Sequence, residues 1–590
     1  MISKSFSTLL ICMLLLVFVV PPASMQQSTA GYSWSHTGFD DAATYFNPQN
    51  ALNKDNVAYV NQDWMSSLSN EPRIYGNETA RTTSSLLDIN GLLYFIDRSQ
   101  LMLALDSKDA RLIWSQQLTV ADPNRFGLEN VFVHNRQINY FDKKIWLIDL
   151  DCSLKGYGAS NGAIQVNIPP SVLCGENPAG TALHETLHRE LSAPVFYEKG
   201  RIIVVAPSGF ETKDHATAYV LGINLDTQQV AWKTSLTENP QENLELGVGP
   251  WAVDQDKGIV YIGTGSPIPE WNASKRPGAN LYSDSIIALD AATGKILWNF
   301  QATPHDLNGY GCTGNTVLGE REGKKVIYAA CRNGYLYALD AESGKPVWTF
   351  DPPAVKRLNS DNTDTSKPWL NSPSKDAAVQ CPGVYGAVSS NIVLAYGNIY
   401  LSTFNRCSKI NIAPVPNIGD TGVRNITLLD NPVGPVNSTL YNVDATTGKA
   451  KWSIPFINGT ALKGGLTVSG GLLYLPSPDG NLYAYDASSG SLVWKRNFGQ
   501  LGLAIPPVIA ATAHGNWTLI QVVAGTPSLD FPVEQHSGFL FMFILPQSLV
   551  TNTSASIEPS SISDMIIYAV VAVAILLLVT TIIFFLRGRR

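Results

Sequence analysis

The sequence is poor in charge. Only 15% of its 590 residues are Asp, Glu, Lys or Arg, against about 25% in an average soluble protein. Its 41 basic residues are outnumbered by 48 acidic ones, which gives a net charge of −7. This balance argues against a nucleic-acid partner, which needs clustered cations. Disorder is also excluded for most of the chain, because 23 Tyr, 21 Phe and 13 Trp are too many large apolar groups to leave in water. Few charges, many aromatics and 47 Gly favour a β-rich protein outside the cytoplasm.

The N-terminus has the features of a secretory signal. Lys4 precedes the apolar run 9–20, and small residues follow it. The alternative is an N-terminal membrane anchor, but the run is short for a bilayer span of about 20 residues. We therefore expect residues 1–24 to be a cleaved signal peptide.

The C-terminus predicts a membrane anchor. Residues 565–586 are uncharged and almost wholly apolar, long enough to cross a bilayer, and three arginines lie in the tail 587–590. The alternative is a buried core helix. We expect a transmembrane helix over 565–586 with the C-terminus in the cytoplasm, preceded by a Ser/Thr-rich stalk over 547–564. The protein is thus predicted to be a single-pass protein with its bulk on the extracytoplasmic face.

Two further features fit an exported chain. Six cysteines lie beyond the signal: Cys152, Cys174, Cys312, Cys331, Cys381 and Cys407. Consecutive pairing closes the shortest loops and is the preferred prediction, although six cysteines allow about 15 pairings. Seven sequons predict glycosylation: Asn77, Asn272, Asn425, Asn437, Asn458, Asn516 and Asn552.

A repeated motif organises the region between the two ends. An apolar run, an Asp, a turn that usually contains Gly and then a Trp eight residues after the Asp recur along the chain. The copies end at Trp114, Trp298, Trp348, Trp452 and Trp494, with a shortened one at Trp232. The pattern predicts a β-hairpin in which Asp caps the turn and Gly takes a positive φ. A Trp at a fixed offset is placed to dock between neighbouring sheets.

The spacing of these copies predicts one closed propeller. They lie about 40 to 60 residues apart, or twice that where a copy is degenerate. We place the two degenerate copies near residues 149–156 and 396–407, which makes eight. A series of β-sandwiches would need linkers, and none is evident between residues 40 and 545. The expected fold is all-β, an eight-bladed β-propeller over residues 40–546.

The motif A-x-D-x-x-T-G-x-x-x-W and the stretch from 261 to 306 resemble the quinoprotein alcohol dehydrogenases. That stretch contains the glycine turn, P-W-N, R-P-G and T-P-H-D of the family. The resemblance implies a pyrroloquinoline quinone (PQQ) cofactor with Ca²⁺ or a lanthanide. It also implies that Arg136 binds a cofactor carboxylate, that Arg332 lies beside the quinone oxygens, and that Glu211 is a metal ligand. It further implies a structural disulfide between Cys381 and Cys407.

Several family positions are changed in this chain. The cysteine pair that covers the quinone corresponds to residues 130–131, which are Asn and Val, and a cofactor-contacting Glu corresponds to Thr83. The Trp below the quinone corresponds to Val248, although Trp251 is near. The metal-ligand Asn corresponds to Ser266, and the catalytic Asp corresponds to Gly309. These losses remove both stacking surfaces, one metal ligand and the base.

The remaining candidates for chemistry lie around the mouth of the channel. Arg136 and Arg332 would bind an anion, Asp306 or Glu211 would act as acid or base with His305 beside it, and Cys312 would exchange sulfur if it were a free thiol. Each residue also has a structural alternative: salt bridges for the arginines, a solvated loop for Glu211, a turn for His305 and Asp306, and a disulfide for Cys312. Ser266 and Trp251 complete the candidate binding residues.

Three functions follow from these residues. The preferred one is a hydrolase of a small sulfur anion that needs no cofactor, because the chain is similar to the tetrathionate hydrolases, which keep the propeller, lack the quinone site and work outside the cell in acid. The second is an alcohol dehydrogenase dependent on PQQ and a metal. The third is a non-catalytic binding or scaffold propeller. The expected partners are a small anionic substrate and the membrane, with a homo-oligomer as a further option.

Overall fold

The computed structural model describes a series of segments that all lie in the first of two units, residues 1–549; the second unit is residues 550–590. The described residues are 33–67, 85–97, 100–119, 137–149, 151–174, 192–207, 218–237, 243–247, 249–268, 276–357, 378–383, 386–388, 390–410, 431–457, 462, 464–499, 502–503, 505–511, 517–523 and 539–549. Within them, no helix has the length and apolar character needed to cross a membrane. The predicted signal peptide, membrane helix and cytoplasmic tail lie outside the described residues, as does most of the predicted stalk.

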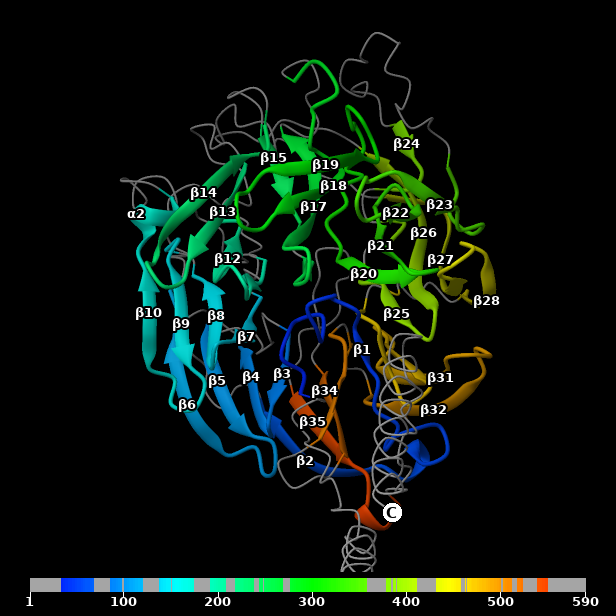
Figure 1. The fold of residues 1–590 in the computed structure, drawn as a ribbon. Coiled ribbons are helices and arrows are strands. Elements are labelled where there is room, and N and C mark those ends of the chain that lie inside the picture. Colours follow the sequence, from blue (N-terminus) through cyan, green and yellow to red (C-terminus); the bar gives the residue numbers. More distant parts are fainter. Residues whose placement is uncertain are drawn as a thin grey trace, which may run out of the picture. The chain divides into compact units, whose positions relative to one another are not determined.

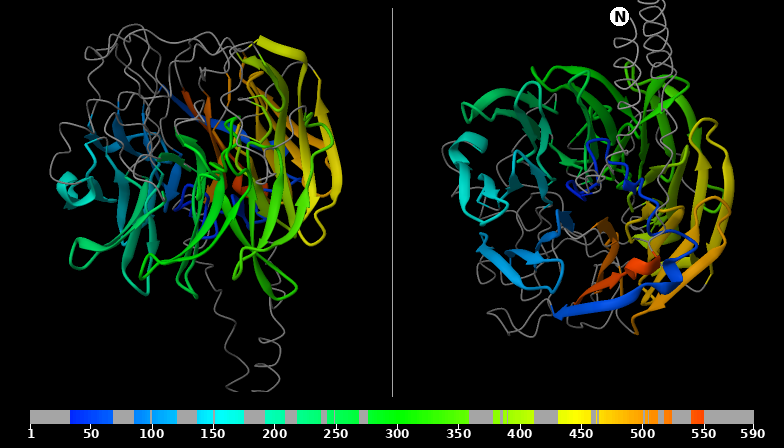
Figure 2. Two further views of the ribbon diagram at one scale, coloured as in Figure 1. Left: turned by 90° about the horizontal axis from the view of Figure 1, so that it is seen from above. Right: turned by 60° about the horizontal axis from the view of Figure 1, so that its bottom comes forward.

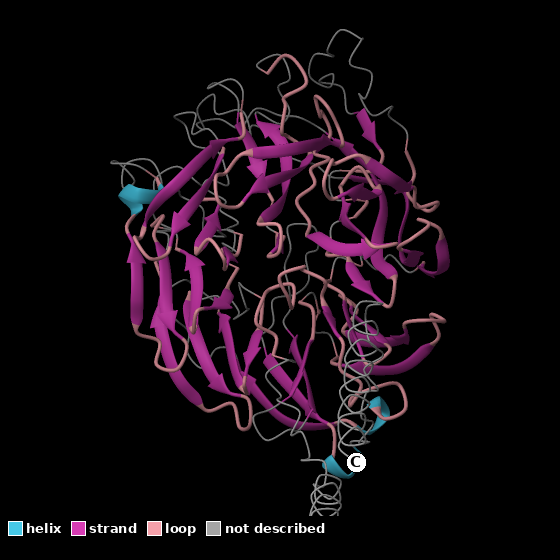
Figure 3. Ribbon diagram, in the orientation of Figure 1, coloured by secondary structure: helices cyan, strands magenta, loops and turns pink. Residues whose placement is uncertain are grey.

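The described strands form eight sheets, which confirms the predicted eight-bladed propeller (Figures 1 and 3). Blade 1 contains β3 (Leu87–Ile89), β4 (Leu92–Ile96), β5 (Leu101–Asp106) and β6 (Leu112–Gln117). Blade 2 contains β7 (Asn139–Phe141), β8 (Lys144–Ile148), β9 (Leu154–Gly158) and β10 (Ile164–Ile168). Blade 3 contains β11 (Val195–Tyr197), β12 (Ile202–Val205), β13 (Tyr219–Asn224) and β14 (Gln229–Ser235). Blade 4 contains β15 (Asn243–Leu246), β16 (Ala252–Asp254), β17 (Ile259–Ile268), β18 (Ser285–Asp290) and β19 (Ile296–Gln301).

The other four blades follow the same antiparallel plan. Blade 5 contains β20 (Thr316–Arg321), β21 (Lys324–Ala330), β22 (Leu336–Asp340) and β23 (Pro346–Phe350). Blade 6 contains β24 (Ala378–Gln380), β25 (Val393–Ala395), β26 (Asn398–Ile410), β27 (Asn431–Asp444) and β28 (Ala450–Phe456). Blade 7 contains β29 (Thr467–Ser469), β30 (Leu472–Pro476), β31 (Asn481–Asp486) and β32 (Leu492–Asn497), with β1 (Phe46–Asn47) parallel to β29. Blade 8 contains β33 (Val508–Ala511), β34 (Trp517–Val523), β35 (Phe539–Ile544) and β2 (Asn61–Ser67). Short helices are α2 (Pro170–Leu173), η2 (Val57–Tyr59) and η5 (Gln547–Leu549).

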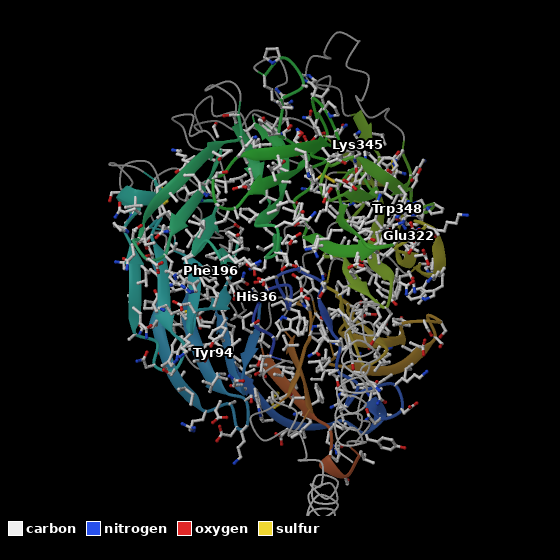
Figure 4. All side chains as sticks on the ribbon, viewed as in Figure 1. His36, Tyr94, Phe196, Glu322, Lys345 and Trp348 are labelled. Atoms are coloured by element: carbon white, nitrogen blue, oxygen red, sulfur yellow. A yellow bond between two sulfur atoms is a disulfide. The ribbon has the colours of Figure 1, made fainter. Side chains whose placement is uncertain are left out.

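The repeated tryptophans join five of the blades to the blade that follows. In five blades the indole N–H of the outer strand donates to a backbone carbonyl in a turn of the following blade. The pairs are Trp114 to Ala159 (2.8 Å), Trp232 to Ala291 (2.9 Å), Trp298 to Ala341 (3.0 Å), Trp348 to Ala445 (3.1 Å) and Trp452 to Ala487 (3.3 Å). Figure 4 labels Trp348.

The glycine of each docking turn makes room for the ring. At Gly344, where φ is +69°, a β-carbon would lie 2.5 Å from the Trp298 ring, and at Gly294 it would lie 2.3 Å from the Trp232 ring. The Asp of the turn accepts backbone N–H groups: Asp340 Oδ1 accepts that of Ser343 at 2.9 Å. The motif therefore encodes the docking of one blade on the next as well as the hairpin.

The ring is closed by a strand from the N-terminal part of the chain. β2 pairs antiparallel with β35, so blade 8 takes its outer strand from residues 61–67 (Figure 1). Trp64 on this strand donates its indole N–H to the carbonyl of Ser107 in blade 1 at 2.9 Å. The closing contact thus repeats the docking of the other blades.

The eighth blade corrects the expected position of one degenerate copy. The copy placed near 149–156 is confirmed, because these residues lie in blade 2. The copy placed near 396–407 is wrong, since β25 and β26 belong to the same sheet as the hairpin at Asp444. The spacing from Asp340 to Asp444 is long because β26 and β27 have 13 and 14 residues and lie on either side of a long connection. The second degenerate copy is blade 8, whose strands come from both the N-terminal part of the chain (β2) and the C-terminal part (β33 to β35).

A second N-terminal segment, residues 34–47, runs inside the ring and is here called the axial segment (Figure 2). It contacts one strand in each of seven blades, which are all blades except blade 3, through backbone or side-chain hydrogen bonds. The contacts are Trp34 with Asp88, Ser35 with Tyr140, Asp41 with Val253, Ala42 with Leu318, Thr44 with Leu394, Tyr45 with Val468 and Asn47 with Ile509. The axial segment thus joins blades from the inside, as the tryptophans do from the outside.

The disulfides follow the predicted consecutive pairing. Cys152 bonds Cys174, Cys312 bonds Cys331 and Cys381 bonds Cys407. The alternative of a free thiol at Cys312 is therefore wrong. Of the seven sequons only Asn437 lies among the described residues, where its Oδ1 accepts a hydrogen bond from Asn405 Nδ2 at 2.6 Å.

We predict that Asn315→Ala destabilises the propeller by about 2–4 kcal/mol. The Asn315 side chain is 3% exposed and donates to the carbonyls of Ala43 and Ile392 while it accepts the Ile392 N–H at 2.9 Å. Its loss leaves these buried groups without partners. Chemical denaturation measures the effect, and Asn167→Ala, an exposed position on β10, is the matched control. Equal stability of the two variants would contradict this role.

We also predict that Asp88 weakens the fold as the pH rises. Asp88 is fully buried; only one of its carboxylate oxygens has a partner, the Gly91 N–H at 3.1 Å. Burial, partly offset by this bond, raises its pKa to about 7. The folded state therefore holds a proton that the unfolded state releases above about pH 4, and stability falls between about pH 4 and 7. Relative to wild type, Asp88→Asn should raise the free energy of unfolding by as much as about 4 kcal/mol at pH 8 and by little at pH 4. Thermal denaturation at the two pH values measures this difference.

Candidate functional site

Three segments of blades 4 and 5 meet at the candidate site: the end of β17, the connection from β19 to β20, and the turn after β21. The Cys312–Cys331 disulfide joins two of them with a Cα–Cα distance of 4.2 Å. Backbone bonds complete the joint, since the Arg332 N–H donates to Gly311 at 2.9 Å and the Cys312 N–H donates to Thr264 at 2.8 Å. Glycine at 311 permits the approach, because a β-carbon there would lie 2.7 Å from the Gly265 Cα.

Arg332 brings a positive charge to this joint. Its side chain is partly buried, and its Nε atom is buried without a hydrogen-bond partner. Among the residues that the structure describes, no carboxylate forms an ion pair with its guanidinium. The structural alternative of a blade-to-blade salt bridge is thus absent from the described residues. A half-buried guanidinium with free donors is suited to binding an anion.

Asp306 stabilises the connection between β19 and β20. Its Oδ1 accepts the Asn308 N–H at 2.8 Å, and its Oδ2 accepts the Tyr310 N–H at 2.7 Å and the Ser266 hydroxyl at 3.1 Å. The turn that was the alternative for Asp306 is therefore present. Gly309, at the family position of the catalytic base, lies within this turn at φ +76°. Because Ser266 donates to Asp306, the residue at the metal-ligand position binds a carboxylate instead.

Asp284 is the most unusual group of the site. It lies just before β18 and is fully buried, with the Ser283 and Asp306 side chains beside its carboxyl. Burial and the neighbouring Asp306 carboxyl raise its pKa well above the ordinary value, against an opposing effect of Ser283 and the Arg276 guanidinium. The raised pKa favours the protonated form of the Asp284 carboxyl. Two neighbouring carboxyls of this kind are an arrangement that can hold and transfer one proton.

Arg276 fixes the segment that covers this carboxyl pair. It is fully buried and bonds Asn280 Oδ1 at 2.8 Å and the Asp306 carbonyl at 2.5 Å. The sequence reasoning missed both Arg276 and Asp284. An available signal was the acidic residue at the start of the otherwise apolar strand in SDSIIALD.

The other predicted residues divide into three groups. His305 is fully buried, with Nδ1 2.6 Å from the Gly278 carbonyl, so it holds the same loop. Trp251 is 2% exposed and packs in the core with Val253 and Ile262, so protein atoms cover its ring. Arg136 and Glu211 lie outside the described residues. The structure thus brings together Ser266, His305, Asp306, Cys312 and Arg332 around the joint of blades 4 and 5.

An eight-bladed propeller with tryptophan docking and a polar joint between two blades defines the structural class, and comparison with known proteins defines the family. The model of the glucose/ethanol/alcohol dehydrogenase β-propeller domain matches residues 34–369, more than half of the chain, and the chain belongs to this family. A second model, outer membrane protein assembly factor BamB, matches residues 436–513.

The relatives that match over most of the chain include quinoprotein alcohol dehydrogenases. The chain is 25% identical over 571 residues to quinoprotein alcohol dehydrogenase PedH of Pseudomonas putida, covering 87% of this chain and 91% of that protein. It is 25% identical to the putative dehydrogenase XoxF of Paracoccus denitrificans, over 78% and 82% of the two chains. The crystal structure of quinohemoprotein alcohol dehydrogenase from Comamonas testosteroni has a TM-score of 0.68 at 20% identity, covering 88% of this chain and 82% of that one. A europium-containing methanol dehydrogenase gives 0.67 at 19%, covering 87% and 98%. These structural matches show the fold alone.

The described residues fit one part of a PQQ site and not another. The unpaired Arg332 guanidinium suits the negatively charged groups of the quinone. The described residues offer no comparable site for the metal ion, because they contain no group of three His, Cys, Asp or Glu side chains that would hold it. We therefore derive no step through a metal.

We predict that Asp284→Asn raises the melting temperature at pH 8 and not at pH 4. The wild-type carboxyl must either remain protonated or be ionised without a donor, whereas the amide has no charge at either pH. The folded state binds a proton that the unfolded state releases, so the benefit of the substitution grows as the pH rises above the ordinary Asp pKa of about 4. Thermal denaturation at both pH values tests this, with the exposed Asp63→Asn as control. A loss of stability at pH 8 would show that Asp284 is ionised and paired.

Proposed function

We propose that the propeller is an extracytoplasmic oxidoreductase that binds a small anionic cofactor through Arg332 and oxidises an alcohol. The observation that carries the proposal is the half-buried guanidinium without an ion-pair partner, at the family position beside the quinone oxygens. Family membership supports it, since the relatives over most of the chain are alcohol dehydrogenases. PQQ would supply the two-electron acceptor when bound.

The residues of the joint have separate tasks in this proposal. Arg332 binds a carboxylate or carbonyl oxygen of the cofactor, and the Cys312–Cys331 disulfide holds the Arg332 backbone in place. The pair of Asp284 and Asp306 holds the proton that the substrate alcohol must release, in place of the base lost at Gly309. Because both carboxyls are buried, the proton of the alcohol would reach them through hydrogen-bonded groups or water.

A second candidate is hydrolysis of a small sulfur anion such as tetrathionate. It is favoured by the glycine at the base position and by the buried carboxyl pair, which provides one group able to donate a proton and one able to accept it. Arg332 would bind a sulfonate group in this reaction. Its chemistry needs neither a quinone nor a metal.

The proposed location is the extracytoplasmic side of a membrane. Three disulfides among the described residues suit an oxidising compartment. The apolar segment 565–586 and the arginines after it would provide the anchor with the C-terminus in the cytoplasm.

The test measures binding and turnover by the full-length chain. We expect PQQ with Ca²⁺ or La³⁺ to bind and to support dye reduction with short alcohols. Arg332→Ala should weaken PQQ binding about 10–100-fold, because a charge-assisted hydrogen bond is lost, while Arg111→Ala at an exposed pair serves as control.

Other outcomes of this experiment separate the alternatives. Turnover of tetrathionate near pH 2 or pH 6 without added quinone would replace the dehydrogenase by the hydrolase. If neither PQQ nor tetrathionate binds, the propeller has no enzymatic role of either kind, and a binding or scaffold function takes their place. Equal PQQ affinity of wild type and Arg332→Ala would remove Arg332 from the site.

A further inference from the structure

A separate cavity of about 330 Å³ lies between blades 6 and 7 and the loop that precedes β2. Its wall is formed by the loop 50–55, the turn from β25 to β26, and the turns before β30 and after β31. None of these segments belongs to the joint of blades 4 and 5, so the cavity does not depend on the proposed function. Its volume lies at the lower end of the range for small-molecule sites, about 300–1,000 Å³.

An aromatic ring forms one side of this cavity. Tyr396 is 51% exposed although it lies in a tight hairpin turn with φ +50°. Its ring is held edge-on by Phe46 at 4.9 Å, and its hydroxyl accepts the Gly471 N–H at 3.0 Å. The ring is thus fixed in position while half of its surface faces solvent. A β-carbon at Gly471 would meet nothing within 4 Å, so the space beside this glycine is open.

Amide groups around the ring have unused hydrogen-bonding capacity. Asn398 is 7% exposed, and its Nδ2 donates to the Tyr396 carbonyl at 2.8 Å. Its Oδ1 is buried and has no partner. A buried acceptor without a donor costs free energy, which a ligand hydroxyl would recover. Asn50 lies on the exposed side of the cavity and offers a further amide.

The charges of the cavity exclude several classes of ligand. Lys54 Nζ lies 3.5 Å from Asp486 Oδ2, and Asp55 adds another carboxylate, so the lining has a net charge of −1. This disfavours an anion. The density of amide and charged groups disfavours an apolar ligand, and the lysine disfavours a bare metal ion. A neutral ligand with many hydroxyl groups matches both the amides and the aromatic face.

We propose that this cavity binds a sugar ring. The C–H face of the sugar packs on Tyr396, and its hydroxyls bond the Asn398 Oδ1, the Asn50 amide and the Lys54–Asp486 pair. A hexose has about 12 non-hydrogen atoms, which at the ligand efficiency of ordinary small ligands corresponds to a dissociation constant of about 2 mM.

The experiment uses saturation-transfer NMR and titration calorimetry on the full-length chain with methyl α-D-mannopyranoside and methyl β-D-glucopyranoside. We expect at least one glycoside to bind and Tyr396→Ala to weaken it at least about 10-fold, while Tyr396→Phe retains most of the affinity. Tyr59→Ala, another exposed tyrosine outside the cavity, is the matched control. Asn50→Ala provides a second test if Tyr396→Ala does not fold.

Three results would overturn the proposal. The first is no binding of either glycoside at 20 mM, a concentration of about 10 times the expected dissociation constant. The second is equal binding by wild type and the two cavity variants. The third is tighter binding of D-glucuronate than of the glucoside, which would indicate an anion site. Because none of these measurements involves Arg332 or a quinone, their failure is distinguishable from failure of the proposed function.

Discussion

The structure depends on the docking of tryptophans from the outer strands of six blades on the next blade. The indole N–H finds a buried carbonyl and the ring lies over a glycine that has no side chain to displace it, as for Trp298 with Ala341 and Gly344. A single blade cannot bury both faces of its sheet, so this contact converts unstable hairpins into a ring. The charged Asp of the motif accepts N–H groups of its own turn, and in some copies it also forms an ion pair outside the turn, as Asp486 does with Lys54.

The N-terminal part of the chain supplies what the repeat does not. β2 completes blade 8, and the axial segment bonds one strand in each of seven blades. Both contacts join residues hundreds of positions apart, such as Asn47 with Ile509. The loop-closure entropy of these contacts must be offset by contacts that form together. The ring is therefore expected to be a cooperative unit, in contrast to an open array of repeats.

The resemblance to the quinoproteins implies that the joint of blades 4 and 5 corresponds to their quinone site with different charged and polar groups. The Cys312–Cys331 disulfide and the glycines around it fix the backbone of Arg332. Where the family has a metal ligand and a base, this chain has a serine bonded to Asp306 and a glycine in a turn. Asp284 adds a buried carboxyl whose pKa is raised by desolvation and by the neighbouring Asp306. The proposed chemistry therefore depends on the Arg332 cation and on this carboxyl pair.

The sequence by itself determined the blade motif, the number of blades and the disulfide pairing, because each depends on local patterns or short loops. It did not reveal that Trp64 docks on Ser107, because β2 comes from the N-terminal part of the chain whereas the rest of blade 8 comes from residues 508–544. Nor did it reveal Asp284 or the cavity at Tyr396. The effect of a carboxyl or an amide depends on how many donors and how much water surround it, and only the tertiary structure sets these numbers.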